Sequence, residues 1–308
     1  MGLFDKLTAP VFYMDNSTAQ QQLSELEKLE KNAVGDIRNA IEREIRLVEA
    51  GIAGEEQVHF ELMNSHIPMY VLHDLRLECN GLSAQIDYLI ITKYHIYIVE
   101  CKNLFGNIEI NNAGDFIRTL TYGKQVKREG IYSPITQNQR HLELIKELRS
   151  ETKNFIARNL FEKSFYDTYR SVVVLSNPKT VLNAKYAKKD IKNQVIRADQ
   201  LIAYIRKIDA SAGSIATSEK DMENLAKFFA QAHTPSPVDY LERFRNQINE
   251  SAPQTVPAVE PHIKDHEILC PKCGAPMIKR VATKGANCGN EFYGCSNFPK
   301  CRSIINIK

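Results

Sequence analysis

The chain has no hydrophobic run long enough to cross a membrane. A membrane-spanning helix needs about 20 consecutive apolar residues, and the best candidate stretch is interrupted by Asp87, Lys93 and His95. The first residues, MGLFDKLTAPVF, lack the charged start, long apolar centre and small-residue cleavage site of a signal peptide. Only two of the seven cysteines precede residue 270, which does not suit a disulfide framework. We therefore expect a cytoplasmic protein that has no membrane partner.

A large net charge is also missing. The value of +3 is too small to indicate a partner, but residues 263–308 hold 8 Lys or Arg against 3 Asp or Glu. The rest of the chain holds 32 against 34, a net charge of −2. The length of 308 residues suits about two domains. The Pro-rich stretch 251–261, SAPQTVPAVEP, is a candidate linker in front of the basic tail.

Two apolar runs dominate the first half of the sequence. Ala84–Thr92 and Ile96–Cys101 carry Ile, Val, Leu and Tyr at both odd and even positions. This pattern is typical of strands that are buried on both faces. We therefore expect an α/β fold in which helices cover both sides of the sheet.

The same two runs carry charges where charges are costly. With a two-residue turn at Lys93-Tyr94, Asp87 faces Glu100 on the neighbouring strand, although a one-residue change in the turn would shift this facing. Alternation places Lys102 on the face of Glu100 and Cys101 on the opposite face. Opposed carboxylates repel each other and need a cation. Oxygen ligands favour Mg²⁺ or a similar ion, and Lys102 could neutralise charge that builds up on a phosphate.

These residues resemble a known nuclease family. Gln85-Ile86-Asp87 and Val99-Glu100-Cys101-Lys102-Asn103 are similar to the Asp…Glu-x-Lys core of the PD-(D/E)XK superfamily, and within it to the nuclease-related domain (NERD) family. The resemblance implies a restriction-endonuclease-like mixed sheet flanked by helices, over about residues 51–207. It also implies Mg²⁺- or Mn²⁺-dependent hydrolysis of DNA, with Asp87 and Glu100 as the metal ligands. His95 and Cys101 depart from the usual Gly and Thr of the family.

The resemblance adds two site residues outside the hairpin. Glu55 matches a helix glutamate that reaches the metal site, with Glu56 as its competitor, although both acids could simply favour a helix N-terminus. Gln137 matches the Gln of a Pro-x-x-Gln-Asn segment at the active site. Ser133 and Pro134 are typical of the start of this helix. We interpret His141, one turn further on, as a helix-surface or packing residue.

Two further segments flank the nuclease-like region. Residues 1–50 contain an amphipathic pattern that predicts one helix over 16–50, ended by Gly51. It could pack on the chain's own body or form a coiled coil. Residues 208–262 predict a helical extension followed by the linker.

The tail, residues 263–308, has the cysteine spacing of a zinc site. Cys270-x2-Cys273 and Cys295-x5-Cys301 supply four soft ligands, and a segment this short needs a metal to fold. Cys288 is left over as a free thiol or a substitute ligand. The segment resembles the topoisomerase-type zinc ribbon, which implies DNA binding, chiefly to single strands or processed ends. Aromatic and basic residues suited to stacking and backbone contact are Lys279, Arg280, Lys284, Phe292, Tyr293, Phe298, Lys300 and Arg302.

These patterns leave three functions open. The first is a metal-dependent nuclease that the ribbon delivers to DNA, with Glu55, Asp87, Glu100, Lys102 and Gln137 as its catalytic unit. The second is a non-catalytic nucleic-acid-binding protein that retains the nuclease fold. The third, compatible with either, is an interaction protein that acts through the helix around Leu23–Val48. The patterns specify no oligomeric state.

Overall fold

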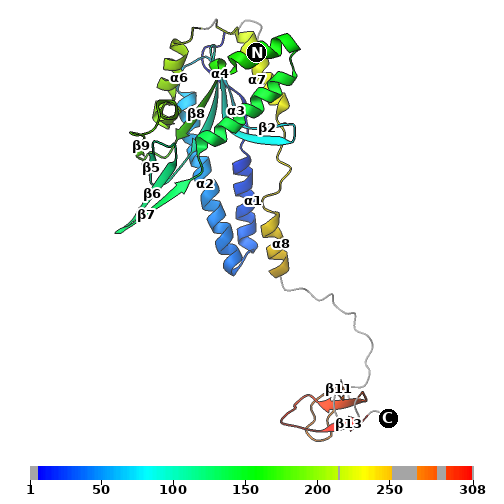
Figure 1. Cartoon of the computed structure of the whole chain (residues 1–308). Helices are drawn as coiled ribbons and strands as arrows, with labels where there is room; N and C mark the ends of the chain where they lie inside the picture. Colours follow the sequence, from blue (N-terminus) through cyan, green and yellow to red (C-terminus); the bar gives the residue numbers. More distant parts are fainter. Residues whose placement is uncertain (1–5, 214–215, 252–268, 283–288, 307–308) are drawn as a thin grey trace. The chain divides into compact units, whose positions relative to one another are not determined.

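The computed structural model describes residues 6–213, 216–251, 269–282 and 289–306 (Figure 1). The chain divides into two compact units, residues 1–251 and 252–308, which we call the body and the tail unit. The linker predicted at 251–261, apart from residue 251, lies outside the described residues, as do Lys284 and Cys288. Within the described ranges, no helix combines the length and the apolar character that crossing a membrane requires.

The body is built on a six-stranded mixed sheet of order β1-β2-β3-β4-β8-β10. The strands β2, β3 and β4 are antiparallel neighbours, whereas β1 runs parallel to β2, and β4, β8 and β10 run parallel to one another. The sheet therefore confirms the expected mixed α/β architecture. Its strands are β1 (Pro10–Asp15), β2 (Met69–Cys79), β3 (Leu82–Ile91), β4 (Ile96–Lys102), β8 (Tyr169–Leu175) and β10 (Val195–Arg197).

Helices cover both faces of this sheet, as the apolar strands require (Figure 1). One face, which includes Leu89 and Ile98, packs against α3 (Pro134–Glu151), α4 (Phe155–Thr168) and α7 (Glu219–Ala232). The other face, which includes Tyr88 and Val99, packs against α2 (Gly35–Met63) and α6 (Leu201–Ala210). A short 3-10 helix, Ala198–Gln200, precedes α6.

The N-terminal helix differs from the prediction. Two helices, α1 (Thr18–Asn32) and α2, replace the single helix expected over 16–50, and α2 continues through Gly51 to Met63. Residues 33 and 34 are extended and Gly35 has a positive φ of 58°, so the chain folds back at this point. The two helices bury Leu26 and Ile41 together with α8 (Glu242–Ser251). The amphipathic face is thus covered by the body itself.

A second, smaller sheet follows β4 in the order β7-β6-β5-β9. Its inner face packs on Val173, Leu175 and Val195 of the main sheet. The strands β6, β7 and β9 were not predicted from the sequence, because polar residues and very short length hide their alternation. The elements are β5 (Asn107–Ile110), β6 (Phe116–Tyr122), β7 (Gln125–Ile131), β9 (Leu182–Asn183) and the one-turn helix α5 (Lys189–Lys192).

The tail unit contains a three-stranded antiparallel sheet. It consists of β11 (Met277–Val281), β12 (Glu291–Cys295) and β13 (Ile304–Asn306), with β12 in the centre. A small core of cysteines, Met277 and the partly buried Tyr293 lies on one face. This is the zinc-ribbon architecture that the cysteine spacing predicted.

Candidate active site and zinc centre

The β3–β4 hairpin brings Asp87 and Glu100 side by side. The ladder pairs Ile91 with Ile96 and Tyr88 with Val99, and the N–H of Thr92 donates to the carbonyl of His95 at 2.9 Å. This is the register expected from a two-residue turn. The next pair outward is Asp87 and Glu100, where the ladder gives way to a side-chain contact: the N–H of Cys101 donates to Oδ2 of Asp87 at 2.6 Å.

Glu100 is buried, with only 1% of its surface exposed. Its Oε1 lies 2.5 Å from Nζ of Lys102, which forms an ion pair along the same strand. Its Oε2 is buried and has no hydrogen-bond partner among the described residues. A buried carboxylate oxygen without a partner is costly, so this position fits an additional cation or donor.

The charge balance around the two carboxylates points the same way. Burial raises the pKa of Asp87 well above its ordinary value, and the negative charges of Glu100 and Glu55 add to the effect. Burial also raises the pKa of Glu100, against the opposing charge of Lys102. Burial alone would lower the pKa of Lys102, but the Glu100 charge outweighs it and the pKa is raised. One lysine therefore does not neutralise the two carboxylates, whereas a divalent cation held between Asp87 and Glu100 would neutralise them.

Helix α3 covers this pair and is anchored by Asn138. The fully buried Asn138 side chain donates to the carbonyl of Ile98 at 2.8 Å and to Oγ of Ser171 at 3.0 Å, which joins α3 to β4 and β8. The helix begins as predicted, with Ser133 as N-cap and Pro134 in the first turn. It thereby places Gln137 beside the Glu100 carboxylate, where its side chain lowers the pKa of Glu100.

His141 lies closer to the site than the sequence indicated. The side chain is buried, and its Nδ1 lies 3.6 Å from Oε2 of Glu100, without a hydrogen bond. Burial, assisted by the charge of Lys102, lowers the pKa of His141 to about 4, so the ring is neutral at pH 7. Its one-turn spacing from Gln137 was the available signal.

Glu55 lies in the middle of α2, which excludes the interpretation that it stabilises a helix N-terminus. A Cβ at Gly54 would lie 2.7 Å from Cβ of Asn103 and 2.7 Å from Oγ of Ser176, so only glycine allows α2 this close to the ends of β4 and β8. The Glu55 side chain is partly buried, and Tyr88 donates to its backbone carbonyl at 2.9 Å. Glu56, its competitor, is exposed.

In this structure the Glu55 carboxylate is held by a histidine. Oε2 of Glu55 lies 3.0 Å from Nε2 of His73, and Nδ1 of the same ring lies 3.0 Å from Oδ1 of Asp15 on β1. Burial lowers the pKa of His73, but the hydrogen bonds to Glu55 and Asp15 outweigh it and the pKa is raised. Glu55, Asp87 and Glu100 do not form a group of ligand atoms all within 4.8 Å of one another in the described part of the chain. A cavity of about 240 Å³ adjoins Glu55 and His73.

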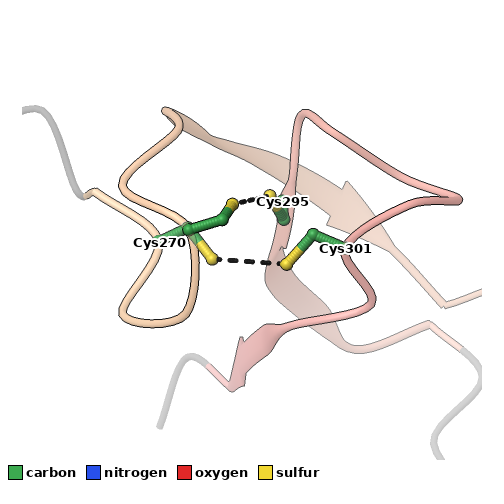
Figure 2. A group of neighbouring side chains, drawn as sticks. Cys270, Cys295 and Cys301 are labelled. Atoms are coloured by element: carbon green, nitrogen blue, oxygen red, sulfur yellow. Dashed lines mark hydrogen bonds between the residues drawn. The ribbon is translucent and has the colours of Figure 1, made fainter.

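The tail unit brings together the four predicted zinc ligands. Sγ of Cys270 lies 3.7 Å from Sγ of Cys301, and Sγ of Cys273 lies 3.4 Å from Sγ of Cys295. All four sulfur atoms lie within 4.8 Å of one another; Figure 2 shows Cys270, Cys295 and Cys301. Zinc bonded to four sulfurs at about 2.3 Å needs sulfur separations of about 3.8 Å. The cluster therefore fits a structural zinc ion.

Backbone donors support this cluster. The N–H groups of Lys272 and Asn297 donate to Sγ of Cys270 and of Cys295, each at 3.4 Å. Burial would raise the pKa of Cys270, but the N–H groups of Lys272 and Cys273 outweigh it and the pKa falls to about 6. At Cys295, by contrast, burial outweighs the N–H of Asn297 and the pKa is raised. A thiolate at Cys270 suits metal binding.

The predicted DNA-contacting residues of the ribbon divide into two groups. Tyr293 packs against the cysteine core, and Lys279 pairs with Glu291 at 2.7 Å. Arg280 and Phe292 face away from that core, and a Cβ at Gly294 would lie 3.3 Å from Cδ of Arg280. Three further predicted DNA-contacting residues are exposed: Phe298, Lys300 and Arg302.

Comparison with known proteins agrees with both parts of the chain. Residues 50–176 match the family described as the nuclease-related domain, and residues 267–308 match the topoisomerase DNA-binding C4 zinc finger. The chain therefore carries a nuclease-related domain of the PD-(D/E)XK superfamily and a topoisomerase-type zinc ribbon.

Two curated proteins are similar to parts of the chain. DNA topoisomerase 1 of Mycoplasmoides gallisepticum is 30% identical over 147 residues, which cover 46% of this chain and 18% of that protein. DNA topoisomerase 1 of Methanocaldococcus jannaschii is 44% identical over 46 residues, 15% of this chain and 5% of that protein. The chain thus spans less than a fifth of either relative. No solved structure matches it.

Proposed function

We propose that the protein is a metal-dependent nuclease that hydrolyses phosphodiester bonds in DNA. The observation that carries this proposal is Oε2 of Glu100, a buried carboxylate oxygen without a hydrogen-bond partner among the described residues, beside Asp87. Asp87 and Glu100 would hold Mg²⁺ or Mn²⁺. When bound, the ion would activate a water molecule and stabilise negative charge on the phosphate.

The other side chains have roles that follow from their positions. Lys102, whose Nζ lies 2.5 Å from Oε1 of Glu100, would lie beside an ion held there, and its ammonium would offset negative charge that develops on the phosphate. Gln137 and the neutral His141 would orient groups around Glu100. Glu55 would complete the acidic site once its carboxylate leaves His73.

The ribbon supplies the second half of the proposal. Its exposed Phe298 and the basic residues Lys300 and Arg302 suit stacking on bases and contact with the phosphate backbone. We therefore propose that it brings the body to DNA, with single strands or processed ends as the preferred form. The six cysteines that the structure describes form no disulfide, which also favours a reducing compartment such as the cytoplasm.

A cleavage assay with the isosteric Glu100→Gln variant tests the catalytic proposal. The purified full-length protein, Glu100→Gln and the matched control Glu56→Gln are incubated with single-stranded, double-stranded and branched DNA in Mg²⁺ or Mn²⁺. We expect cleavage by the wild type and the control, and a loss of at least about 100-fold in Glu100→Gln, as for removal of one electrostatic group from an active site. Circular dichroism checks that all three proteins are folded.

The alternative is a non-catalytic DNA-binding protein. One observation favours it: Glu55 and one oxygen of Glu100 already have protein partners, His73 and Lys102. It would be preferred if no DNA is cleaved under any metal condition while all three proteins bind DNA equally well. Equal cleavage by wild type and Glu100→Gln would also reject the proposed active site.

A further inference from the structure

The segment between β8 and β10 begins directly beside the candidate active site. The N–H of Ser176 donates to the carbonyl of Lys102 at 3.1 Å, and Sγ of Cys101 contacts Oγ of Ser176 at 3.4 Å. The carbonyls of Pro178 and Thr180, two and four residues further on, accept hydrogen bonds from Arg197 of β10, at 3.3 and 2.8 Å. The start of the segment is therefore fixed to the end of β4.

Apolar residues anchor the rest of this segment. Leu182, Ala184, Ala187 and Ile191 pack into the core between the two sheets, and β9 pairs in parallel with β5. A Cβ at Gly114 would lie 2.9 Å from Cδ1 of Ile191, so the fit against the β5–β6 turn is close. With these residues buried or partly buried, the side chains between them are left on the outside.

The exposed side chains of the segment are mostly lysines. Over residues 179–192 there are five lysines and one acid, Asp190, a net charge of +4 in a region of the chain that is otherwise slightly acidic. All five are exposed, and none has an ion-pair partner within the described ranges. We call them the lysine face: Lys179, Lys185, Lys188, Lys189 and Lys192.

The neighbouring β6–β7 hairpin provides a contrast. It is also basic, but Arg118 and Lys127 both pair with Glu129, and Arg128 pairs with Glu109 at 2.9 Å. Three of its four basic side chains are thus paired with two acids, while Lys124 has no ion-pair partner among the described residues. The lysine face has no such pairs, and its like charges repel one another, which favours a polyanionic ligand.

The chemistry of the lysine face suits a phosphate backbone. Several unpaired ammonium groups on an anchored segment can neutralise several phosphates and release their counterions. Tyr186 is 65% exposed, with Nζ of Lys185 5.4 Å from the centre of its ring, and could stack on an unpaired base.

We propose that the lysine face binds the sugar-phosphate backbone of the DNA whose scissile bond lies at Asp87 and Glu100. The inference rests on the proposed function for the location of the scissile bond. It assigns DNA binding to the body itself, in addition to the ribbon.

The test compares two full-length variants with the same change in charge. One carries Lys185→Gln, Lys188→Gln, Lys189→Gln and Lys192→Gln. The control carries four substitutions of exposed lysines on helices elsewhere in the body: Lys31→Gln, Lys163→Gln, Lys220→Gln and Lys227→Gln. The ribbon is unchanged in both, so a difference between them arises in the body.

Affinity for labelled single-stranded and duplex DNA is measured by fluorescence anisotropy over a range of salt concentrations, without added divalent metal. We expect the lysine-face variant to bind at least about tenfold more weakly than the control at low salt. The slope of the logarithm of the binding constant against the logarithm of the salt concentration should become less negative by about 2 to 4, because each lost phosphate contact removes about 0.7 to 0.9 from its magnitude. Equal affinity and equal slope in the two variants would overturn the inference.

Cleavage is measured separately so that the two proposals fail independently. Weaker binding by the lysine-face variant, in a protein that cleaves no DNA, would support the lysine face and reject the nuclease. If the lysine-face variant cleaves and binds DNA as well as the control, the nuclease proposal would be supported and the lysine face rejected. Thermal melting by circular dichroism confirms that both variants are folded.

Discussion

Replacing Gly54 by alanine should destabilise the body, although alanine is the better helix former. The added Cβ would lie 2.7 Å from Cβ of Asn103, an atom that can move only with its backbone, and 2.7 Å from Oγ of the buried Ser176. Overpacking of this kind costs about 1–3 kcal/mol. The gain in helix propensity offsets about 1 kcal/mol of this, so we expect a net loss of up to about 2 kcal/mol.

Gly51 provides a matched control on the same helix. A Cβ at this position meets nothing within 4 Å, so Gly51→Ala should stabilise the body by about 1 kcal/mol. The measurement is urea unfolding of the full chain, followed by circular dichroism at 222 nm, where the helices of the body dominate the signal. A free energy of unfolding that rises equally in both variants would refute the close approach of α2 to β4 and β8.

Two further predictions concern His73 and the ribbon. Because the pKa of His73 is raised in the folded protein, the contribution of the protonated ring to stability is complete below about pH 6.5 and is lost as the pH rises through the raised value. We therefore expect His73→Gln to lower the free energy of unfolding by about 1–3 kcal/mol at pH 6 and by less at pH 9. Thermal melting at both pH values measures this cost, and an equal or larger cost at pH 9 would contradict the prediction. In the ribbon, we expect one zinc ion per chain in the wild type, no zinc in Cys295→Ser and one zinc ion in Cys288→Ser. Metal analysis of the purified proteins measures the zinc content. Loss of zinc in Cys288→Ser would reject the ligand set of Cys270, Cys273, Cys295 and Cys301.

The β3–β4 hairpin could be predicted from local sequence because strand alternation and a short turn determine its register. The pairing of Ile91 with Ile96 follows once Lys93-Tyr94 is taken as the turn, and it sets the position of Glu100. The zinc ligands could be predicted for a similar reason, since the spacing of cysteines in a short segment leaves few ways for the segment to fold. In both cases the informative residues are close in sequence.

Other parts of the site depend on contacts between distant residues. His73 meets Asp15, 58 residues earlier, through a parallel pairing of β1 with β2 that no local pattern specifies. The mid-helix position of Glu55 was hidden because Gly51 looked like a helix end, whereas packing on the sheet holds α2 together beyond it. The buried position of His141 against Glu100 likewise depends on the docking of α3 on β4 through Asn138.

Helix α2 joins the packing of α8 to the candidate active site, which lie far apart in the sequence. Near one end, Ile41 packs with Leu241 and Phe244 at and beside the start of α8, whose last residue precedes the tail unit. Glu55 lies fourteen residues further along the same helix, or about 20 Å away at 1.5 Å per residue. The helix α8, whose last residue precedes the tail unit, is thus packed on the same helix that carries Glu55 of the candidate active site. A displacement of α8 would therefore reach α2 about 20 Å from that carboxylate.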